Sequence, residues 1–240
     1  MLKRLVKSSF RALGLEAQWR DPLAEQIPAG YPRSPFLPRV TRINLRELHY
    51  KHQRLQQAAH VEGDLVECGV SIGHGMLVWI LTSELIGKPR RYFGFDSFEG
   101  FPEPTVSDAG TSLQQGDYAT PPEIVHKVLR DGGVDDCVIN EGLTLVKGWF
   151  EDTLPHFDRP IAVLHLDVDL YDSYKTCLEH LCDRVVPGGV ILFDEYREDD
   201  FPGATKAIDE FFAKRPEQIV VDPIGKAYVV KSPTAARAAA

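Results

Sequence analysis

Segments with strand character alternate with helical segments through most of this chain. Apolar, strand-like runs occupy residues 64–70, 91–97, 143–149, 160–168 and 190–196, and helical patterns occupy residues 43–60, 73–87, 121–131, 171–185 and 203–215. This alternation is typical of a parallel sheet that is covered by helices on both faces. The end of the chain has the pattern of an antiparallel hairpin around residues 223–226. We therefore expect an α/β fold in which a doubly wound, mostly parallel, seven-stranded sheet ends in an antiparallel hairpin.

Length and composition allow one full-sized domain with extensions. Of the 240 residues, 43% are hydrophobic, which is enough for a sizeable core. We expect an N-terminal arm with helices over residues 1–60, the main domain over 61–232 and a flexible tail over 233–240. The arm begins with a basic amphipathic pattern and continues into a proline-rich loop over 21–42. Because such an arm is an unusual addition to a complete domain, we expect it to form a homo-oligomer contact or to cover a cleft.

Charge and hydropathy argue against several classes of protein. The net charge is −8, whereas a domain that binds nucleic acid usually carries a basic face. No run approaches the ~20 apolar residues of a membrane span, and the N-terminus lacks the apolar segment of a secretory signal. The four cysteines match neither a zinc pattern nor a disulfide framework. We expect a cytoplasmic protein with reduced, mostly packed thiols.

Acidic residues follow two of the predicted strands. Asp167, Asp169 and Asp172 come directly after the apolar run that ends near residue 166, and Asp194 and Glu195 end the next apolar run. Carboxylates repel one another and are depleted from buried strands. In parallel sheets, ligands bind outside the carboxyl ends of the strands, and sequential parallel strands often pair. We therefore expect these acids at the rim of a ligand-binding cleft. The Pro-Gly-Gly segment 187–189 is expected to form the turn before the second of these strands.

A glycine-rich turn follows the first predicted strand. Its glycines, Gly69, Gly73 and Gly75, are spaced G-x-x-x-G-x-G, which differs from the G-x-G-x-x-G fingerprint of dinucleotide-binding folds. Glycine still allows a ligand to approach the backbone closely. Asp96 ends the second predicted strand, where an acid can accept hydrogen bonds from ribose hydroxyls. The alternative for Asp96 is a helix or turn cap.

Five segments carry a resemblance to a known family. They are ECGVSIGHG (67–75), FGFDSFEGFP (93–102), KGWFEDTLP (147–155), LDVDLYDS (166–173) and PGGVILFDEY (187–196). In this order they resemble the macrocin-type sugar O-methyltransferases, a family of class I S-adenosylmethionine-dependent methyltransferases, over residues 62 to 215. The family commonly has two aspartates on the fifth strand, where this chain has Asp194 and Glu195. Glutamate is also an oxygen ligand, so metal binding remains the expectation.

The resemblance implies a class I methyltransferase fold, two cofactors and a role for each matching residue. The cofactor-binding residues would be Glu67, Gly69 and Ser71 for the methionine part of S-adenosylmethionine, Asp96 for the ribose and Trp149 for the adenine. Asp167, Asp194 and Glu195 would bind Mg²⁺ or another divalent cation, and Asp169 would be the general base. The implied reaction is a metal-dependent methyl transfer from S-adenosylmethionine to a hydroxyl of a small molecule, such as a natural-product sugar or a related secondary metabolite.

Other interpretations of the same residues remain open at this point. The fold also suits a nicotinamide-dependent oxidoreductase, although the glycine spacing counts against it. A non-catalytic protein that binds S-adenosylmethionine is a further alternative, although it would not need the metal carboxylates. His165, between two leucines, favours a hydrogen-bonded core histidine, and Tyr171 fits a cleft wall and the core equally well. The long polar loop over 98–120 is expected to act as a lid.

Overall fold

The computed structural model describes residues 42–232. The predicted amphipathic N-terminal helix, almost all of the proline-rich loop and the C-terminal tail lie outside the described residues. Within the described part, none of the helices combines the length and the hydropathy that a membrane crossing requires. The four cysteines are free, and all except Cys137 are buried.

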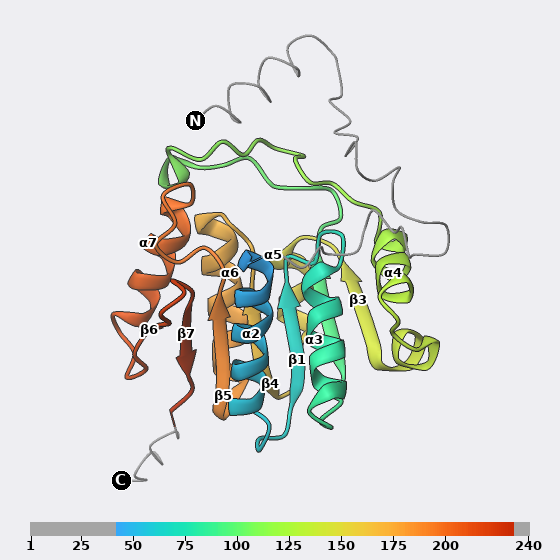
Figure 1. The fold of residues 1–240 in the computed structure, drawn as a ribbon. Coiled ribbons are helices and arrows are strands. Elements are labelled where there is room, and N and C mark those ends of the chain that lie inside the picture. The colour runs from blue at the N-terminus through green and yellow to red at the C-terminus, as the bar shows by residue number, and fades with distance from the viewer. Residues whose placement is uncertain (1–41, 233–240) are drawn as a thin grey trace. The chain divides into compact units, whose positions relative to one another are not determined.

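A seven-stranded sheet forms the centre of the domain, in the order β3-β2-β1-β4-β5-β7-β6 (Figure 1). Its strands are β1 (Asp64–Cys68), β2 (Tyr92–Asp96), β3 (Leu143–Lys147), β4 (Ile161–Leu166), β5 (Val185–Phe193), β6 (Val220–Val221) and β7 (Ala227–Val230). The first five strands pair in parallel. The hairpin of β6 and β7 adds two antiparallel strands beside β5. The predicted fold class is therefore confirmed, with β1 and β4 paired at the point where the strand order reverses.

Helices cover both faces of the sheet. The α-helices are α2 (Arg42–Gln57), α3 (His74–Leu85), α4 (Pro122–Asp131), α5 (Phe150–Thr153), α6 (Tyr171–Leu181) and α7 (Pro202–Phe212). Short 3₁₀ turns are η2 (Val106–Asp108), η4 (Leu154–His156) and η5 (Cys182–Arg184), and η3 (Val138–Gly142) is a π-helical turn. One apolar core includes buried residues of α2, α3 and α4, and the other includes those of α6 and α7.

Successive residues of the central strands contribute to opposite cores. Leu65, Val163 and Val190 pack with α2, α3 and α4, whereas their neighbours in sequence, Val66, Leu164 and Ile191, pack with α6 and α7. This follows from the strand geometry, since side chains alternate between the two faces of a sheet. The central strands can be apolar throughout because both faces are buried.

The predicted turn at residues 187–189 is wrong. These residues lie inside β5, which begins at Val185. The strand is irregular here: its register against β4 shifts between Ile161 and Val163, and Gly188 has φ +83°. The backbone is nevertheless paired, because Gly188 N donates to Lys231 O at 2.9 Å. Glycine thus allows a bulged strand at a sequence that otherwise favours a turn.

Candidate active site

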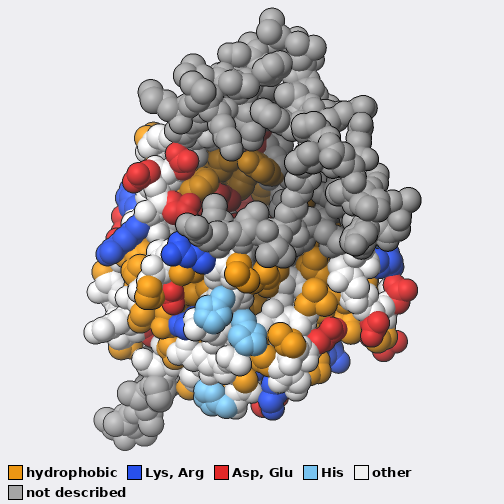
Figure 2. Space-filling model, in the orientation of Figure 1, with side chains coloured by type: hydrophobic (Ala, Val, Ile, Leu, Met, Phe, Trp, Pro, Cys, Tyr) orange, Lys and Arg blue, Asp and Glu red, His pale blue; other side chains and the backbone are white. Residues whose placement is uncertain are grey.

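A cavity of about 890 Å³ lies at the carboxyl ends of the central strands. Six of the predicted site residues line it: Gly69, Ser71, Asp96, Trp149, Asp167 and Asp169. The wall continues through the 98–120 loop, which contributes Phe101, Leu113 and Tyr118. Glu67, Asp194 and Glu195 are not among its lining residues. In Figure 2, acidic and apolar side chains gather around the hollow in the upper part of this face.

The glycine turn brings the backbone of β1 against that of β4. Gly69 has φ +85°, and a Cβ built there would lie 1.8 Å from Asp167 O. Only glycine fits this contact without moving the chain. Ser71, in the same turn, has φ +48°, a conformation that L-residues rarely adopt. The turn therefore places its backbone at the cavity wall directly beside the acidic end of β4.

Asp96 holds this turn in place. Its Oδ2 accepts hydrogen bonds from Val70 N at 2.9 Å and Ser71 N at 2.8 Å, and its Oδ1 accepts one from Phe98 N at 2.7 Å. The turn-cap alternative for Asp96 is thus present in the structure. Asp96 also lines the cavity, so capping and ligand binding are compatible for the same carboxylate.

Glu67 lies beneath the turn. It is 1% exposed, and its Oε1 lies 2.9 Å from His165 Nδ1 on the neighbouring strand. A Cβ at Gly75 would lie 2.1 Å from the same oxygen, so the carboxylate is packed against the first turn of α3. Burial, above all, raises the pKa of Glu67 to about 8 and lowers the pKa of His165 well below its usual range. The prediction that His165 is a hydrogen-bonded core histidine is confirmed.

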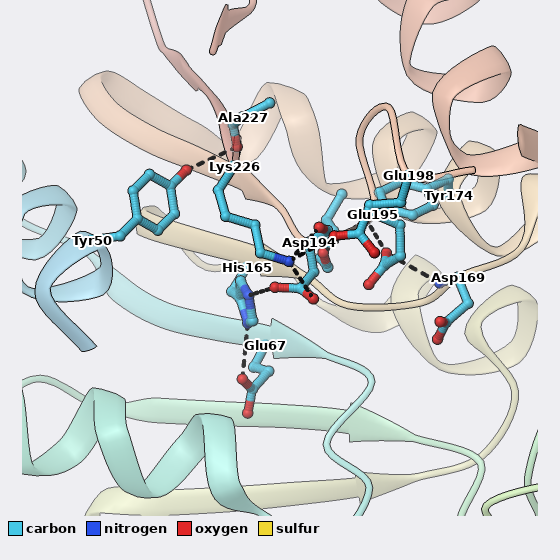
Figure 3. A network of polar contacts seen from close by, with 11 residues as sticks. Tyr50, Glu67, His165, Asp169, Tyr174, Asp194, Glu195, Glu198, Lys226 and Ala227 are labelled. Atoms are coloured by element: carbon cyan, nitrogen blue, oxygen red, sulfur yellow. Dashed lines mark hydrogen bonds and ion pairs between the residues drawn. The ribbon is translucent and has the colours of Figure 1, made fainter. Parts of the chain in front are cut away.

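Four carboxylates gather where β4 and β5 end. Asp167 belongs to two groups of possible ligand atoms that lie within 4.8 Å of one another: one contains His165 and Asp194, the other Asp169 and Glu195. The predicted metal ligands Asp194 and Glu195 are thus both near Asp167, but they belong to different groups, so the structure does not bring all three predicted ligands into one group. Figure 3 shows His165 between Glu67 and Asp194, and Glu195 between Tyr174 and Asp169.

Two lysines partly balance these acids. Lys226 Nζ, from the β6–β7 hairpin, donates to Asp194 O at 2.8 Å, Asp194 Oδ2 at 3.0 Å and Glu198 Oε1 at 3.1 Å. Burial would raise the pKa of Asp194, but Lys226 and the other positive groups around it, Lys51 of α2 among them, lower it. At Asp167 and Asp169, by contrast, burial and the neighbouring acids outweigh the lysines, and the pKa is raised. Burial and then repulsion from Asp194 raise the pKa of Asp167 to about 7, and burial and then repulsion from Asp167 raise that of Asp169 to about 8.

Glu195 is buried and lies within hydrogen-bond distance of a tyrosine hydroxyl. Tyr174 Oη lies 2.5 Å from Glu195 Oε2 and 2.9 Å from Leu166 O. A hydroxyl carries one proton, so it donates to one of these oxygens at a time. A protonated Glu195 can supply the second proton, in agreement with burial and repulsion from Asp167, which raise the pKa of Glu195 well above its usual range. Asp169 N also donates to Glu195 Oε2, at 3.3 Å.

Asp169 is held in a strained backbone conformation. Its φ is +57°, and Leu170 N donates to Val168 O across it at 2.6 Å, which makes a tight turn between β4 and α6. Non-glycine residues with positive φ cost energy and are enriched at active sites. The turn directs the chain from the cavity into the first residue of α6.

Sequence reasoning missed the cations and the buried partners of the acids. Lys226 follows a turn glycine in the hairpin, and Tyr174 lies within an ordinary helical pattern. Glu67 and His165 are 98 residues apart and meet only because β1 and β4 are paired in that register. The predicted order of the strands could have placed the two residues on neighbouring strands. It could not have predicted that their side chains are in direct contact.

Comparison with known proteins adds a family match. The family described as macrocin O-methyltransferase matches residues 37–229. A 4'-O-methyltransferase of Streptomyces olivaceus, which acts on a rhamnosyl-tetracenomycin, is 36% identical over 148 residues, or 58% of this chain and 55% of that enzyme. The mycinamicin III 3''-O-methyltransferase of Micromonospora griseorubida is 31% identical over 186 residues, or 71% of this chain and 69% of that enzyme.

Solved structures agree with this match. The crystal structure of the calicheamicin methyltransferase CalS11 superposes with a TM-score of 0.69 and 26% sequence identity. The superposition covers 79% of this chain and 80% of that one. The similarity therefore extends through most of the described domain.

Proposed function

The chain belongs to the macrocin O-methyltransferase family of S-adenosylmethionine-dependent enzymes, and we propose that it methylates a hydroxyl group of a natural-product sugar or a related metabolite. The observation that carries this proposal is one cavity in which the glycine turn and Asp96 lie beside Asp167 and Asp169. A cofactor bound at the turn would present its methyl group toward the acidic strand end, where an acceptor hydroxyl can lose its proton.

The turn and its surroundings suit S-adenosylmethionine. Gly69 and Ser71 would contact the methionine part, Asp96 would accept hydrogen bonds from the ribose, and Trp149, which precedes α5 at the cavity wall, would lie near the adenine. Glu67 would act from below the turn, because its carboxylate is packed against Gly75 rather than exposed to the cavity. Its part in cofactor binding would then be to shape the turn.

The carboxylates fit a divalent cation. Asp167, Asp194 and Glu195 would hold Mg²⁺, which prefers oxygen ligands. Because Asp194 and Glu195 belong to different groups of possible ligands that share Asp167, one ion would draw both side chains toward Asp167. Burial first, and then repulsion between the acids, raises the pKa values of Asp167 and Glu195. A bound dication would relieve that repulsion. When present, it would lower the pKa of the acceptor hydroxyl and orient it.

Asp169 is the proposed general base. A hydroxyl that attacks the methyl group must lose its proton, and a carboxylate near it can accept that proton on Oδ1 or Oδ2. The pKa of about 8 for Asp169 makes it a stronger base than an exposed aspartate, although a smaller fraction is ionised at neutral pH. A neighbouring cation would favour the ionised form. The strained turn fixes this carboxylate at the cavity wall.

The charge of the cavity favours an acceptor without phosphate. Among the lining residues that the structure describes there is no lysine or arginine, and eight are acidic: Asp96, Glu103, Asp108, Asp117, Glu151, Asp167, Asp169 and Asp172. A nucleotide-linked sugar would bring its diphosphate into this negative field. A neutral or cationic glycoside would bring no such negative charge. Phe101 and Tyr118, with ring centroids 5.8 Å apart, offer apolar surface for its binding.

Two measurements test the proposal. Calorimetry should show that the protein binds S-adenosylhomocysteine and does not bind NADH. This result would distinguish a methyltransferase from a nicotinamide-dependent oxidoreductase. With methyl-labelled S-adenosylmethionine and Mg²⁺, a panel of glycosides should yield an O-methylated sugar, whereas the nucleotide diphosphate forms of the same sugars should not. Binding of NADH in place of S-adenosylhomocysteine would contradict the cofactor assignment. Methylation of the nucleotide-linked sugars alone would contradict the acceptor class.

A further inference from the structure

One acid of the cavity wall has no part in the reaction proposed above. Asp108 lies in η2, near the middle of the 98–120 loop, and is 3% exposed. Val106, two residues earlier, is 96% exposed. Val106 therefore adds little apolar burial that could hold this turn against the domain. Asp108, in contrast, has three contacts there.

The first contact is with the start of α6. Asp108 Oδ1 accepts a hydrogen bond of 2.7 Å from Tyr171 N, the first residue of that helix. The first N–H groups of a helix have no partner within it, and Leu170 at the N-cap offers no side-chain hydrogen bond. A carboxylate at this end is favourable for the helix dipole as well. A side chain 63 residues earlier in the sequence thus caps α6.

The second contact is within the loop. Asp108 Oδ2 accepts hydrogen bonds from Thr105 N and Thr105 Oγ1, both at 2.9 Å. Each carboxylate oxygen therefore has a separate function: one reaches the helix and the other fixes the turn that presents it. Neither oxygen can be removed without loosening the connection between the loop and the helix.

The third contact is a close approach to α7. A Cβ at Gly203, in the first turn of that helix, would lie 2.0 Å from Asp108 Oδ1. Glycine at this position leaves room for the carboxylate between the starts of α6 and α7. Nearby, Lys206 Nζ of α7 donates to Ser107 Oγ at 3.1 Å, but this contact is exposed.

The base of the loop is fixed separately. Phe101 N donates to Asp117 O at 3.0 Å, and Gly116 N donates to Phe101 O at 2.9 Å. The two arms of the loop are thus paired shortly after the end of β2, and Asp108 makes its contacts farther along the loop. Figure 1 shows the loop running across the carboxyl edge of the sheet to α7.

We propose that Asp108 is a positioning residue that fastens the 98–120 loop to the starts of α6 and α7 and so keeps the cavity closed over its ligands. The identity of those ligands rests on the proposed function, but the fastening does not. Because Tyr171 follows Asp169 by two residues, the same hydrogen bond also fixes the start of α6 beside the proposed base.

Two substitutions at different sites should release the loop. Asp108→Ala removes the carboxylate. Gly203→Ala keeps the carboxylate, but the added methyl group occupies the space in which the carboxylate lies. In hydrogen-exchange mass spectrometry, peptides from 98–120 should exchange about tenfold faster or more in both variants, as expected when a helix cap is lost. Lys206→Ala removes the exposed hydrogen bond to Ser107 and a cation–π contact with the Tyr171 ring, and it leaves the Asp108 carboxylate and its hydrogen bonds in place. It is the matched control and should stay close to wild type.

The effect on ligands distinguishes positioning from general stability. In stopped-flow measurements, S-adenosylhomocysteine should dissociate about tenfold faster from Asp108→Ala and Gly203→Ala, while peptides from β1 and β4 exchange as in wild type. Asp108→Asn, which keeps one oxygen for Tyr171 N, should fall between wild type and Asp108→Ala, and it replaces the alanine variant should that variant fail to fold.

The outcomes separate this inference from the proposed function. Unchanged exchange of the 98–120 loop in both Asp108→Ala and Gly203→Ala would overturn the fastening role. Faster exchange of the loop with unchanged dissociation of S-adenosylhomocysteine would overturn its role in closing the cavity. If wild type does not bind S-adenosylhomocysteine, the proposed function fails, while the exchange measurement still decides whether Asp108 fastens the loop.

Discussion

Individual residues of the site have two tasks at once. Asp96 caps the glycine turn through three backbone N–H groups and also lines the cavity. Glu195 and Tyr174 share a short hydrogen bond beneath the acids that face the cavity. A substitution at such a residue should therefore change binding and local structure together, and an experiment has to measure both.

Asp96 provides the first prediction. Asp96→Ala should weaken the binding of S-adenosylhomocysteine by about 1.5–3 kcal/mol, since hydrogen bonds from the ribose to a charged acceptor are lost. It should also lower the thermal midpoint, because Val70 N and Ser71 N lose their acceptor. Calorimetry and thermal unfolding measure the two effects. Asp136→Asn, an exposed acid paired with Arg130, is the control. Unchanged affinity of Asp96→Ala would remove Asp96 from the binding site.

At the level of elements, the strands and their ends were easier to predict than the contacts between distant elements. Alternating apolar and helical segments predicted the five parallel strands and the hairpin, because each pattern reflects burial on one or two faces. The acids at the ends of β4 and β5 followed from the same reasoning. The turn at residues 187–189 was predicted wrongly, because local turn propensity cannot reveal that pairing with the chain after β7 keeps this segment in β5.

Contacts between distant elements account for what sequence reasoning missed. Lys226 reaches Asp194 from the hairpin, His165 meets Glu67 across two paired strands, and Asp108 caps a helix 63 residues later. Each contact depends on register, rotamer and loop path together. None leaves a local pattern of residue types in the sequence.

The hairpin provides the second prediction. Lys226→Met removes the ammonium that binds both Asp194 and Glu198, so uncompensated acids should remain at the end of β5. The free energy of unfolding should fall by about 2 kcal/mol, less than for a fully buried pair because Asp194 is partly exposed. Added Mg²⁺ should recover part of this loss. Urea unfolding with and without Mg²⁺ measures it, with Lys206→Met as an exposed control. Equal stability of variant and wild type without Mg²⁺ would contradict this electrostatic role.

At the scale of the whole chain, the role of the predicted N-terminal arm stays a prediction. The family match begins at residue 37, and α2 already belongs to the described domain, since Tyr50 Oη donates to Ala227 O at 2.9 Å. The arm before this helix is predicted to contact a second subunit or to cover the cavity. The fold alone accounts for the position of the site, but not for this additional segment.

Deletion of residues 1–40 tests the arm. We expect a lower oligomeric mass by light scattering, or a changed rate of methyl transfer if the arm covers the cavity instead. A deletion of residues 233–240 is the matched control, since the tail is predicted to have neither role. A protein without residues 1–40 that keeps both its mass and its turnover would show that the arm is dispensable.

The two acids after β4 are proposed to have different roles: Asp167 binds a cation, and Asp169 acts as the general base. Asp167 is shared by both groups of possible ligands, whereas Asp169 belongs to one of them and occupies a strained turn at the cavity wall. Asp167→Asn should therefore lower metal affinity, and excess Mg²⁺ should restore part of the rate. Asp169→Asn should keep the metal but slow the chemical step by about 10²–10⁴-fold, a loss of transition-state stabilisation that added metal does not recover.

The most direct measurement is methyl transfer to a confirmed acceptor as a function of Mg²⁺ concentration, for wild type, Asp167→Asn and Asp169→Asn, with EDTA as the control. We predict that EDTA abolishes wild-type activity, that Mg²⁺ rescues Asp167→Asn in part, and that Asp169→Asn stays slow at every concentration. Wild-type activity that survives EDTA would contradict the metal-dependent mechanism. Rescue of Asp169→Asn by Mg²⁺, without rescue of Asp167→Asn, would reverse the two roles.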